Sequence, residues 1–496
     1  MKIVLISTDE SKVGMGVKTL SCCLLNNGFQ TSIVLMATLE ENYHDFAWND
    51  LLGLCKDAGL IGISCMTHGV TKAIEIKSIL TKHISTPIVI GGIHASLTPE
   101  SLVEAFDFVC HGEGEDLIVE LACRLEEKTF IENIPGLWLK KNGEIIRNPS
   151  VPLIKKLSEY PFPDYDISHL FILEANKLVQ IRSISQHINI EDFVVLGSRG
   201  CPHHCTYCCN SKIKHEFPWR RKVLHYPIDY LIKHLKTVRK KFPEVKSFWI
   251  DDDTFLANRQ EEINFFADRY EKEIALPFKI NISPWTYQKE KLFPLIKAGM
   301  KKLIIGIQSG SERVNYDIYD RKISNKKLLE IAFSLHEYSN LQKYYDFIGM
   351  SPFESVNDLV STIDFIKSLP YPYRIYNNNL AFYPGTELYE KAIMSGFDVK
   401  LRVKHSDPRI GFNIIINEKL KHKFFHLILL LMAGDVTRFR FGYVPKVFIS
   451  NILIRAYAFI DNKYPRLIDT IATIIAFFLY HCQWRKFVKN TLSPKM

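Results

Sequence analysis

The stretch 200–208 reads Gly200-Cys201-Pro202-His203-His204-Cys205-Thr206-Tyr207-Cys208, and it follows directly on an apolar run at 193–196. Three thiolates within so short a loop can converge on one inorganic centre, and thiolates favour an iron–sulfur cluster or zinc. Four irons held by three cysteines leave one iron open for a substrate. A structural zinc site needs a fourth protein ligand. His203, His204 or Cys209 would have to supply it in a cramped geometry, so the spacing leaves both centres open.

Apolar runs continue after this loop in a regular series. They lie at 193–196, 247–250, 278–282, 302–307, 344–348 and 375–382, with helical periodicity between them. Short continuous apolar runs separated by helical stretches are typical of buried parallel strands. The series therefore predicts an α/β unit over 193–395, a (β/α)6 barrel or partial barrel whose chemistry lies at the carboxyl ends of its strands.

A second series of apolar runs precedes the loop. The runs at 3–7, 32–36, 60–64, 88–90 and 106–110 predict a doubly wound, Rossmann-like domain over 1–145, with a ligand crevice at the carboxyl ends of its strands. The Pro-rich stretch 146–192, which includes Tyr160-Pro161-Phe162-Pro163, is predicted to be an irregular linker or strap.

The bulk composition indicates a cytoplasmic protein. Apolar residues make up 47% and charged residues 24% of the 496 residues, which is ordinary for a chain with several folded domains. The 11 cysteines are scattered through the chain rather than arranged as a disulfide framework. The first residues, MKIVLIST, lack the long apolar segment of a signal peptide. We therefore expect a reducing, cytoplasmic setting.

The net charge of +9 is confined to the end of the chain. Residues 417–496 contain 13 Lys and Arg against 4 Asp and Glu, and the basic residues are interleaved with Phe, Leu and Ile. This pattern predicts a basic helical region over 396–496. It fits either a buried bundle with solvated lysines or peripheral contact with a membrane surface. The longest apolar run, 467–482, contains Asp469 and is shorter than the roughly 20 residues of a spanning helix. No RNA-module motif accompanies the charge, so we expect no nucleic-acid partner.

The cysteine spacing, with Tyr207 in the aromatic position, resembles the radical S-adenosylmethionine superfamily. The resemblance implies that Cys201, Cys205 and Cys208 hold a [4Fe–4S] cluster. In that family the open iron chelates the amino and carboxylate groups of S-adenosylmethionine. An electron from the cluster then releases a 5′-deoxyadenosyl radical, which abstracts a hydrogen from the substrate. The resemblance also implies an electron donor such as ferredoxin or flavodoxin.

Four further segments resemble strand-end motifs of this superfamily, and they implicate a set of residues around S-adenosylmethionine. The segment 248–255 has the Asp-Asp-x-Phe ending of the second strand, where a carboxylate would meet the amino group. The segment 306–313 resembles the ribose motif, with Gln where Glu is common. The segment at 347–350 resembles the glycine segment near adenine, and 383–389 resembles the Pro-Gly-Thr segment after the sixth strand. The residues implied are Asp252, Asp253, Gln308, Ser309, Gly310 and Gly349.

The third strand departs from the family pattern. An Arg that often follows it is replaced here by Asn281-Ile282-Ser283-Pro284-Trp285. The group that would contact the carboxylate of S-adenosylmethionine is therefore unassigned.

The first domain resembles the cobalamin-binding subgroup of the superfamily. Many cobalamin domains carry Asp-x-His-x-x-Gly after the first strand, with His beneath cobalt; here Asp9 and Gly14 match, and Ser11 stands in place of His. A hydroxyl is a poor cobalt ligand, so bound cobalamin would have no His below it. The resemblance assigns the nucleotide tail to Ser64, Gly91 and Gly92, and His94 lies in a crevice loop. The alternative is that the domain keeps the fold without cobalamin.

Together the resemblances imply a radical enzyme that methylates an unactivated carbon or phosphorus centre of a small-molecule substrate. Its cofactors would be the [4Fe–4S] cluster, S-adenosylmethionine and cobalamin. The basic, apolar end of the chain adds the hypothesis of a lipid-like or other hydrophobic substrate and membrane association. Two alternatives stay open. One is a radical cyclase, oxidase or C–C coupling enzyme without methyl transfer. The other is a zinc or redox-sensing binding protein.

Overall fold

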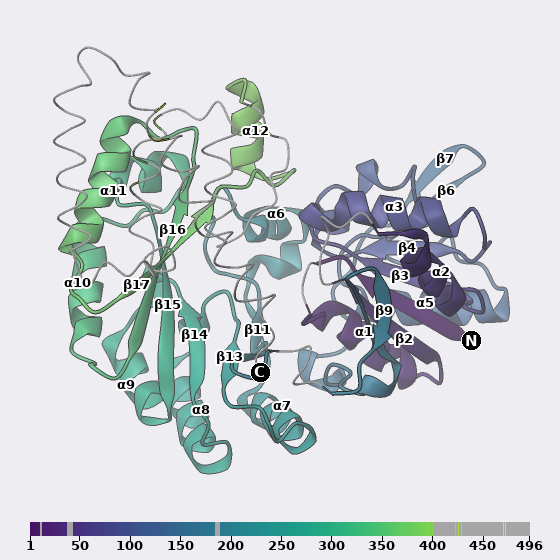
Figure 1. Cartoon of the computed structure of the whole chain (residues 1–496), viewed down its shortest axis with the longest axis horizontal. Coiled ribbons are helices and arrows are strands. Elements are labelled where there is room, and N and C mark those ends of the chain that lie inside the picture. Colours follow the sequence, from purple (N-terminus) through teal and green to yellow (C-terminus); the bar gives the residue numbers. More distant parts are fainter. Residues whose placement is uncertain are drawn as a thin grey trace, which may run out of the picture.

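The computed structural model describes residues 1–9, 12–36, 43–183, 189–397 and 399, with the single positions 422, 425, 428, 470 and 472. Two α/β units lie side by side, one from each half of the described chain (Figure 1). The predicted helical region 396–496 lies almost wholly outside these residues, and so does Ser11. No helix of the described part of the chain is long and apolar enough to cross a membrane.

The first unit is a nine-stranded sheet in the order β7-β6-β5-β4-β3-β1-β2-β8-β9. Its central strands are parallel and consist of buried Val, Ile and Leu, as expected for strands covered on both faces. Strand order reverses between β1 and β3, which makes the doubly wound topology predicted from the sequence. The strands are β1 (Lys2–Ser7), β2 (Gln30–Met36), β3 (Leu60–Ser64), β4 (Ile88–Gly91), β5 (Phe108–Cys110), β6 (Leu137–Lys141), β7 (Glu144–Arg147), β8 (Leu170–Glu174) and β9 (Lys177–Gln180).

Helices cover both faces of this sheet. One core lies between the sheet and α1 and α5, and the other between the sheet and α2 and α3. The helices are α1 (Met15–Leu25), α2 (Asp45–Cys55), α3 (Val70–Leu80), α4 (Ile93–Leu97) and α5 (Glu115–Glu127).

The predicted linker 146–192 requires a correction. It is not irregular throughout, because residues 170–180 form the β8–β9 hairpin, and β8 pairs in parallel with β2. The hairpin turn contains Ala175 and Asn176, both at positive φ, a conformation that suits a two-residue turn between strands. The first sheet therefore extends about 35 residues beyond the predicted boundary at 145.

The second unit is a six-stranded parallel sheet in the order β10-β13-β14-β15-β16-β17, which confirms the predicted partial barrel. The outward side chains of the strands form one large core with the covering helices. The strands are β10 (Phe193–Val195), β13 (Phe248–Ile250), β14 (Phe278–Ile282), β15 (Met300–Gln308), β16 (Gln342–Gly349) and β17 (Arg374–Asn379). The helices are α7 (Ile228–Lys241), α8 (Gln260–Glu273), α9 (Lys289–Lys297), α10 (Asn325–His336), α11 (Val356–Ser368) and α12 (Glu387–Met394).

A small excursion joins the two units. After β10 the chain forms the short antiparallel pair β11 (Ser198–Arg199) and β12 (Leu224–His225), and α6 (Cys209–Glu216) lies between them in sequence. Helix α6 packs against α4 of the first unit through the apolar cluster of Leu97, Ile213 and Phe217. In Figure 1, α6 accordingly lies where the two units meet.

Candidate functional site

The cysteine loop occupies residues 200–208, between β11 and α6. The remainder of the barrel unit anchors it at Thr206, whose Oγ1 donates a hydrogen bond to the carbonyl of Ile318 (2.6 Å) and whose amide donates to the carbonyl of Tyr319 (3.2 Å). The ring of Tyr207 packs edge-on against that of Tyr319, with centroids 5.0 Å apart. The stretch between the second and third cysteines is therefore fixed against the segment that follows β15.

The three thiols lie within electrostatic range of one another in a partly buried, charged setting. Burial raises the pKa of Cys201 to about 12, and the negative charge of Asp253 and of the thiols of Cys208 and Cys205 acts in the same direction. The ammonium of Lys214 interacts with all three thiols, although burial lowers its own pKa. Three thiols of one loop with cationic groups beside them suit an anionic cluster bound through thiolates. Among the described residues, no three His, Cys, Asp or Glu side chains lie close enough to hold a single metal ion.

Arg321 is the second cation at the cysteine loop, and the sequence did not reveal it. Its Nη1 donates to Cys205 Sγ (3.7 Å) and to the hydroxyl of Tyr207 (3.2 Å), and its Nη2 donates to the carbonyl of Gly306 (2.7 Å). The side chain is buried, and its Nε has no hydrogen-bond partner within the described part of the chain. A lone Arg in a loop beyond β15 has no spacing signal. Only the fold brings it beside the cysteines.

Asp252, predicted near the amino group of S-adenosylmethionine, follows β13 and is hydrogen-bonded to the backbone that follows β10. Its Oδ1 accepts hydrogen bonds from the amides of Gly197 (2.6 Å) and Ser198 (2.9 Å). Burial raises the pKa of this carboxyl to about 6, and the two amides act against that shift. Its Oδ2 is buried and has no partner among the described residues. Asp252 therefore offers one acceptor oxygen to a bound group.

The two neighbouring carboxylates have different partners. Asp251 accepts a hydrogen bond from Nδ2 of Asn281 (2.7 Å), and burial raises its pKa to about 6. Asp253 hydrogen-bonds to Asn210 and to the backbone of Gly200, next to Cys201, and burial raises its pKa. The structure thus separates the acidic triplet, and Asp253 is the member that touches the cysteine loop.

Gln308 ends β15 in an uncommon backbone conformation. Its φ is +71°, and the register with β16 shifts between Gly306 and Gln308. A residue with a side chain held in this region stores strain of about 1–3 kcal/mol, and such residues concentrate at ligand sites. A Cβ built on Gly306 would lie 2.5 Å from Gln308 Nε2, so the amide lies over that glycine. Gln308 Oε1 is buried and lacks a partner among the described residues. Gln308 is thus open to a ligand near Arg321.

Ser309 and Gly310 make contacts with α11 rather than with the barrel interior. The hydroxyl of Ser309 lies 3.2 Å from Oγ1 of Thr362, and a Cβ built on Gly310 would lie 2.6 Å from Cβ of Phe365. The helix can approach the strand end this closely only because residue 310 is glycine.

Strand β16 ends at Gly349, predicted near adenine, and also carries Asp346, a partly buried acid that the sequence did not indicate. Gly349 lies against the amide of Asn377, whose Nδ2 is unpartnered among the described residues. Asp346 accepts a hydrogen bond from Asn378, and burial raises its pKa to about 7, an effect that the charge of Arg321 opposes. Buried polar atoms that lack a hydrogen-bond partner among the described residues therefore occur on β15, at Gln308, and on β17, at Asn377 and Asn379.

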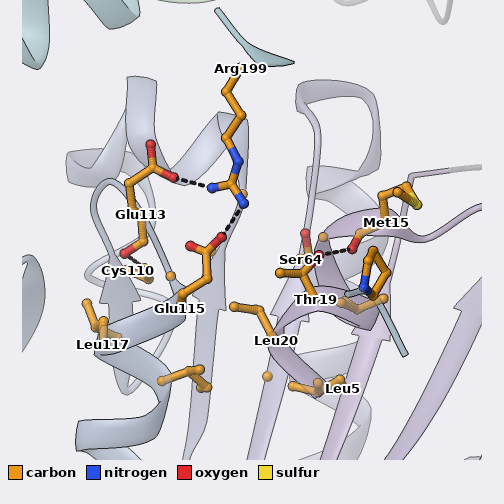
Figure 2. Close-up of a pocket in the computed structure, with 18 of the residues that line it drawn as sticks. Leu5, Met15, Thr19, Leu20, Ser64, Cys110, Glu113, Glu115, Leu117 and Arg199 are labelled. Atoms are coloured by element: carbon orange, nitrogen blue, oxygen red, sulfur yellow. Dashed lines mark hydrogen bonds and ion pairs between the residues drawn. The ribbon is translucent and has the colours of Figure 1, made fainter. Parts of the chain in front are cut away.

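The first unit contains a cavity of about 260 Å³ at the carboxyl ends of its strands. Ser64, Gly91 and Gly92, predicted to receive the cobalamin tail, line it, and Leu5, Leu20 and Leu117 form apolar wall (Figure 2). Gly92 has φ +96°, and a Cβ there would lie 2.6 Å from the carbonyl oxygen of Cys65. The wall is thus built around a backbone path that only glycine takes easily. An apolar cavity at the strand-order switch fits the tail of cobalamin.

The other predicted cobalamin residues lie off the cavity wall. Asp9 accepts hydrogen bonds from the hydroxyl of Ser7 (2.8 Å) and the amide of Met66 (3.1 Å), which ties the ends of β1 and β3 together. Gly14 precedes α1. His94 is buried in α4 with its Nε2 3.2 Å from Oγ1 of Thr98, and burial lowers its pKa. None of these three residues lines the cavity.

The opposite wall of the cavity comes from the barrel unit. Leu196 and Arg199 follow β10, and Tyr226 and Tyr230 stack with centroids 4.9 Å apart near the start of α7. The guanidinium of Arg199 forms ion pairs with Glu113 and Glu115 of the first unit, as Figure 2 shows. The cavity is therefore shared between the two units and lies beside the chain that leads into the cysteine loop.

Comparisons with known proteins agree with this arrangement. Residues 195–366 match the family model of the radical SAM superfamily, and residues 2–122 match that of the B12 binding domain. An uncharacterized methyltransferase of Pyrococcus horikoshii is 26% identical over 70% of this chain and 73% of its own length. The anaerobic magnesium-protoporphyrin IX monomethyl ester cyclase of Rubrivivax gelatinosus is 25% identical over 55% of this chain and 48% of its own length.

Among solved structures, the radical S-adenosylmethionine methyltransferase TsrM from Kitasatospora setae, with cobalamin and a [4Fe–4S] cluster bound, superimposes with a TM-score of 0.63. The two share 14% identity over 79% of this chain and 78% of the other. The likeness shows a common fold in both units.

The two family matches cover the two halves of the site. The radical SAM match includes the cysteine loop, which decides between the cluster and the zinc alternative in favour of a [4Fe–4S] cluster with S-adenosylmethionine. The B12 binding match includes the cavity wall formed by Ser64, Gly91 and Gly92. The chain therefore belongs to the cobalamin-binding radical S-adenosylmethionine enzymes.

Proposed function

We propose that this enzyme transfers a methyl group to an unactivated carbon or phosphorus centre of a small-molecule substrate. The observation that carries the proposal is the shared cavity, since it lies between the two units and its barrel wall runs through Arg199 directly to Cys201. When bound, the cluster with S-adenosylmethionine supplies a hydrogen-abstracting radical, and cobalamin supplies the methyl group. Relatives named as methyltransferases support the same activity.

In this proposal the site residues of the barrel unit either contact the cluster or S-adenosylmethionine or support the residues that do. Cys201, Cys205 and Cys208 hold the cluster. Asp252 Oδ2 and Gln308 Oε1 are free to accept hydrogen bonds from the amino group and the ribose of S-adenosylmethionine. Arg321 supplies a guanidinium for its carboxylate, in place of the Arg that the third strand lacks. Asp253 orients the cysteine loop through Gly200. Ser309, Gly310 and Gly349 shape the walls behind these groups.

The cobalamin site is assigned to the first unit. Ser64, Gly91 and Gly92 line the tail cavity, and Asp9, Gly14 and His94 are assigned to the same site from the sequence pattern, as is Ser11. Ser11 lies outside the described residues. Because Ser11 stands where related domains have His, we propose that this position would supply no imidazole to bound cobalamin.

The substrate and partners are proposed from the sequence. The substrate is a small molecule, and a reductant such as ferredoxin or flavodoxin supplies the electron. The basic, apolar region 396–496 favours a lipid-like substrate and peripheral membrane contact in the cytoplasm.

The alternative is a radical cyclase, oxidase or coupling enzyme, and the cyclase relative favours it. Such a reaction consumes S-adenosylmethionine without handing on its methyl group. The two activities are therefore separated by their by-products.

The test uses the full chain reconstituted anaerobically with iron, sulfide and cobalamin, where we expect about four irons and one cobalt per chain. The protein is then reduced and incubated with deuteromethyl-labelled S-adenosylmethionine and a pool of small molecules. Methyl transfer predicts S-adenosylhomocysteine and 5′-deoxyadenosine in roughly equal amounts, together with a product carrying the label. Cys201→Ala is the control and should form no 5′-deoxyadenosine. Release of 5′-deoxyadenosine without S-adenosylhomocysteine would overturn methyl transfer and support the alternative.

A further inference from the structure

Four charged side chains, largely shielded from solvent, connect the two units beside the cavity. Arg199 donates from Nη1 to Oε2 of Glu113 (2.9 Å) and pairs through Nη2 with Oε1 of Glu115 (2.5 Å). Arg220 donates from Nη1 to the other oxygen of Glu113. The four side chains are 6–17% exposed, and the set is neutral. Glu113 is its centre, because each of its two oxygens is taken by an arginine of the barrel unit.

On the barrel side, this set is attached to the cysteine loop. Arg199 is separated from Cys201 only by Gly200, which has φ +94°. A Cβ built on Gly200 would lie 3.8 Å from Nη2 of Arg220, and the charge of Arg220 also acts on Asp253. Asp253 hydrogen-bonds to the Gly200 backbone. A movement of Glu113 therefore reaches the first cysteine through two arginines.

On the other side, the same set forms part of the cavity wall. Glu113, Glu115 and Arg199 line the cavity, and the glycines at 112 and 114 flank Glu113 in the loop between β5 and α5. Figure 2 shows Glu113 and Glu115 converging on Arg199 at one side of the cavity, with Ser64 at the opposite side. A group that fills the cavity therefore presses against the loop that carries Glu113.

An apolar contact runs parallel to this polar one. Gly91 and Gly92 line the cavity and lead into α4, which packs on α6 through Leu97 and Phe217. Helix α6 begins at Cys209, immediately after the third cysteine. The cysteine loop is thus held at both of its ends by elements that continue from the cavity wall.

We propose that Glu113, clamped by Arg199 and Arg220, is a positioning residue through which an occupied cobalamin cavity sets the geometry of the cysteine loop. Ion pairs shielded from solvent resist displacement, since moving one partner leaves the other charge unpaired in a medium of low dielectric constant. Packed interfaces transmit small shifts for the same reason that cores resist deformation. Cobalamin binding consequently raises the affinity of the cluster site for S-adenosylmethionine. The inference rests on the proposed cofactor sites, but it concerns binding rather than methyl transfer.

The experiment measures the dissociation constant of S-adenosylmethionine on anaerobic protein with an oxidised cluster, so that no turnover occurs. Each protein is studied with and without saturating hydroxocobalamin. In the unaltered enzyme we expect cobalamin to tighten binding about 5- to 150-fold, the usual range for two coupled sites. In Glu113→Gln the two constants should agree to within about twofold, while the four irons and the cobalamin are still bound. Glu120→Gln, which breaks an exposed pair with Arg124 on α5, should keep the full effect.

The ratio of the two constants separates positioning from folding, because a residue needed only for stability changes cofactor loading and leaves the ratio alone. If Glu113→Gln does not bind iron, Arg220→Lys replaces it in the experiment. Lysine keeps the positive charge but lacks the planar guanidinium that pairs with the carboxylate. The ratio of the two dissociation constants should then fall toward one without reaching it. An undiminished ratio in whichever variant loads, or no effect of cobalamin in the unaltered enzyme, overturns the proposal. Absence of a methylated product in the preceding test leaves this ratio unaffected, so the two proposals fail separately.

Discussion

Arg321 and Cys205 meet at 3.7 Å between Nη1 and Sγ, although 116 residues separate them in the chain. The same guanidinium reaches the carbonyl of Gly306 and keeps its Nε free of partners among the described residues. The guanidinium of Arg321 therefore lies beside the thiol of Cys205, and its Nε–H remains available to donate a hydrogen bond. We assign that donor to the carboxylate of S-adenosylmethionine.

Arg321→Met should weaken binding of S-adenosylmethionine by about ten- to a hundredfold, because a hydrogen bond to a charged group contributes about 1.5–3 kcal/mol. Equilibrium dialysis against the reconstituted protein measures the effect, and iron content shows that the cluster is intact. The matched control is Lys322→Met, which removes the exposed neighbouring cation. Equal affinity in both variants would contradict the assignment of Arg321.

Gln308→Gly should separate stability from binding. Glycine adopts φ +71° without strain, so the free energy of unfolding should rise by about 1 kcal/mol, while loss of the amide should weaken binding of S-adenosylmethionine. Asp320→Gly is the control, because Asp320 also has positive φ (+50°) but is exposed. It should gain stability without any loss of affinity. If Gln308→Gly binds as tightly as the unaltered enzyme, the amide has no part in the site.

Gly92→Ala should lower cobalamin affinity at least tenfold without affecting the iron content. The added Cβ would lie 2.6 Å from the carbonyl oxygen of Cys65, so the loop that lines the cavity must move. Gly28→Ala is a matched control, since Gly28 also has positive φ (+85°) but its Cβ would meet nothing within 4 Å. Cobalt and iron counting on the same samples gives both readouts. Normal cobalt content in Gly92→Ala would place the tail elsewhere.

Glu354 should make the stability of the barrel unit depend on pH. Burial raises the pKa of its carboxyl to about 8, and the charge of Asp358 adds to the shift. The folded protein therefore keeps this proton at pH values where the unfolded chain has released it. The stabilisation is complete below about pH 4.5 and is lost as pH rises through 8.

Glu354→Gln removes that charge. Its free energy of unfolding at pH 9 should exceed that of the unaltered protein by on the order of 3 kcal/mol, with little difference at pH 5. Anaerobic urea unfolding at the two pH values measures it. Glu330→Gln, on the exposed side of α10, should show no such difference. Equal stability of Glu354→Gln and the unaltered protein at pH 9 would show that the carboxyl is not buried in ionised form.

The sequence predicted the elements whose signal is local. Runs of Val, Ile and Leu predicted the central strands of the first sheet, since strands covered on both faces are mostly apolar. The barrel strands were predicted from shorter apolar runs that also contain polar residues, such as Lys279 and Asn281 in β14. The cysteine spacing predicts the cluster ligands for a comparable reason, because all three lie in one loop. The β8–β9 hairpin has a local turn signal in Asn176, but its place beside β2 depends on a pairing across more than 130 residues.

The residues of the candidate site that the sequence did not predict are brought together by contacts between distant parts of the chain. Arg321 contacts Cys205 and acts on Asp346 only because β15, which precedes it, and β16 are adjacent in the barrel. Tyr226 and Tyr230 reach the cobalamin cavity only because the two units meet there. The acidic triplet shows a related limit: spacing places three carboxylates together, but the structure sends Asp251 to Asn281 and Asp253 to Gly200.

The pairing of β8 with β2 also constrains how the protein can be made. Until the ribosome has released residues 170–180, one side of β2 is an unpaired edge of a largely apolar strand, and exposed edges of that kind recruit other chains. The first sheet therefore matures late, when the start of the barrel is about to emerge. A fragment ending at residue 145 should aggregate, whereas one ending at 183 closes that edge, and the difference bears on any attempt to produce the cobalamin half by itself.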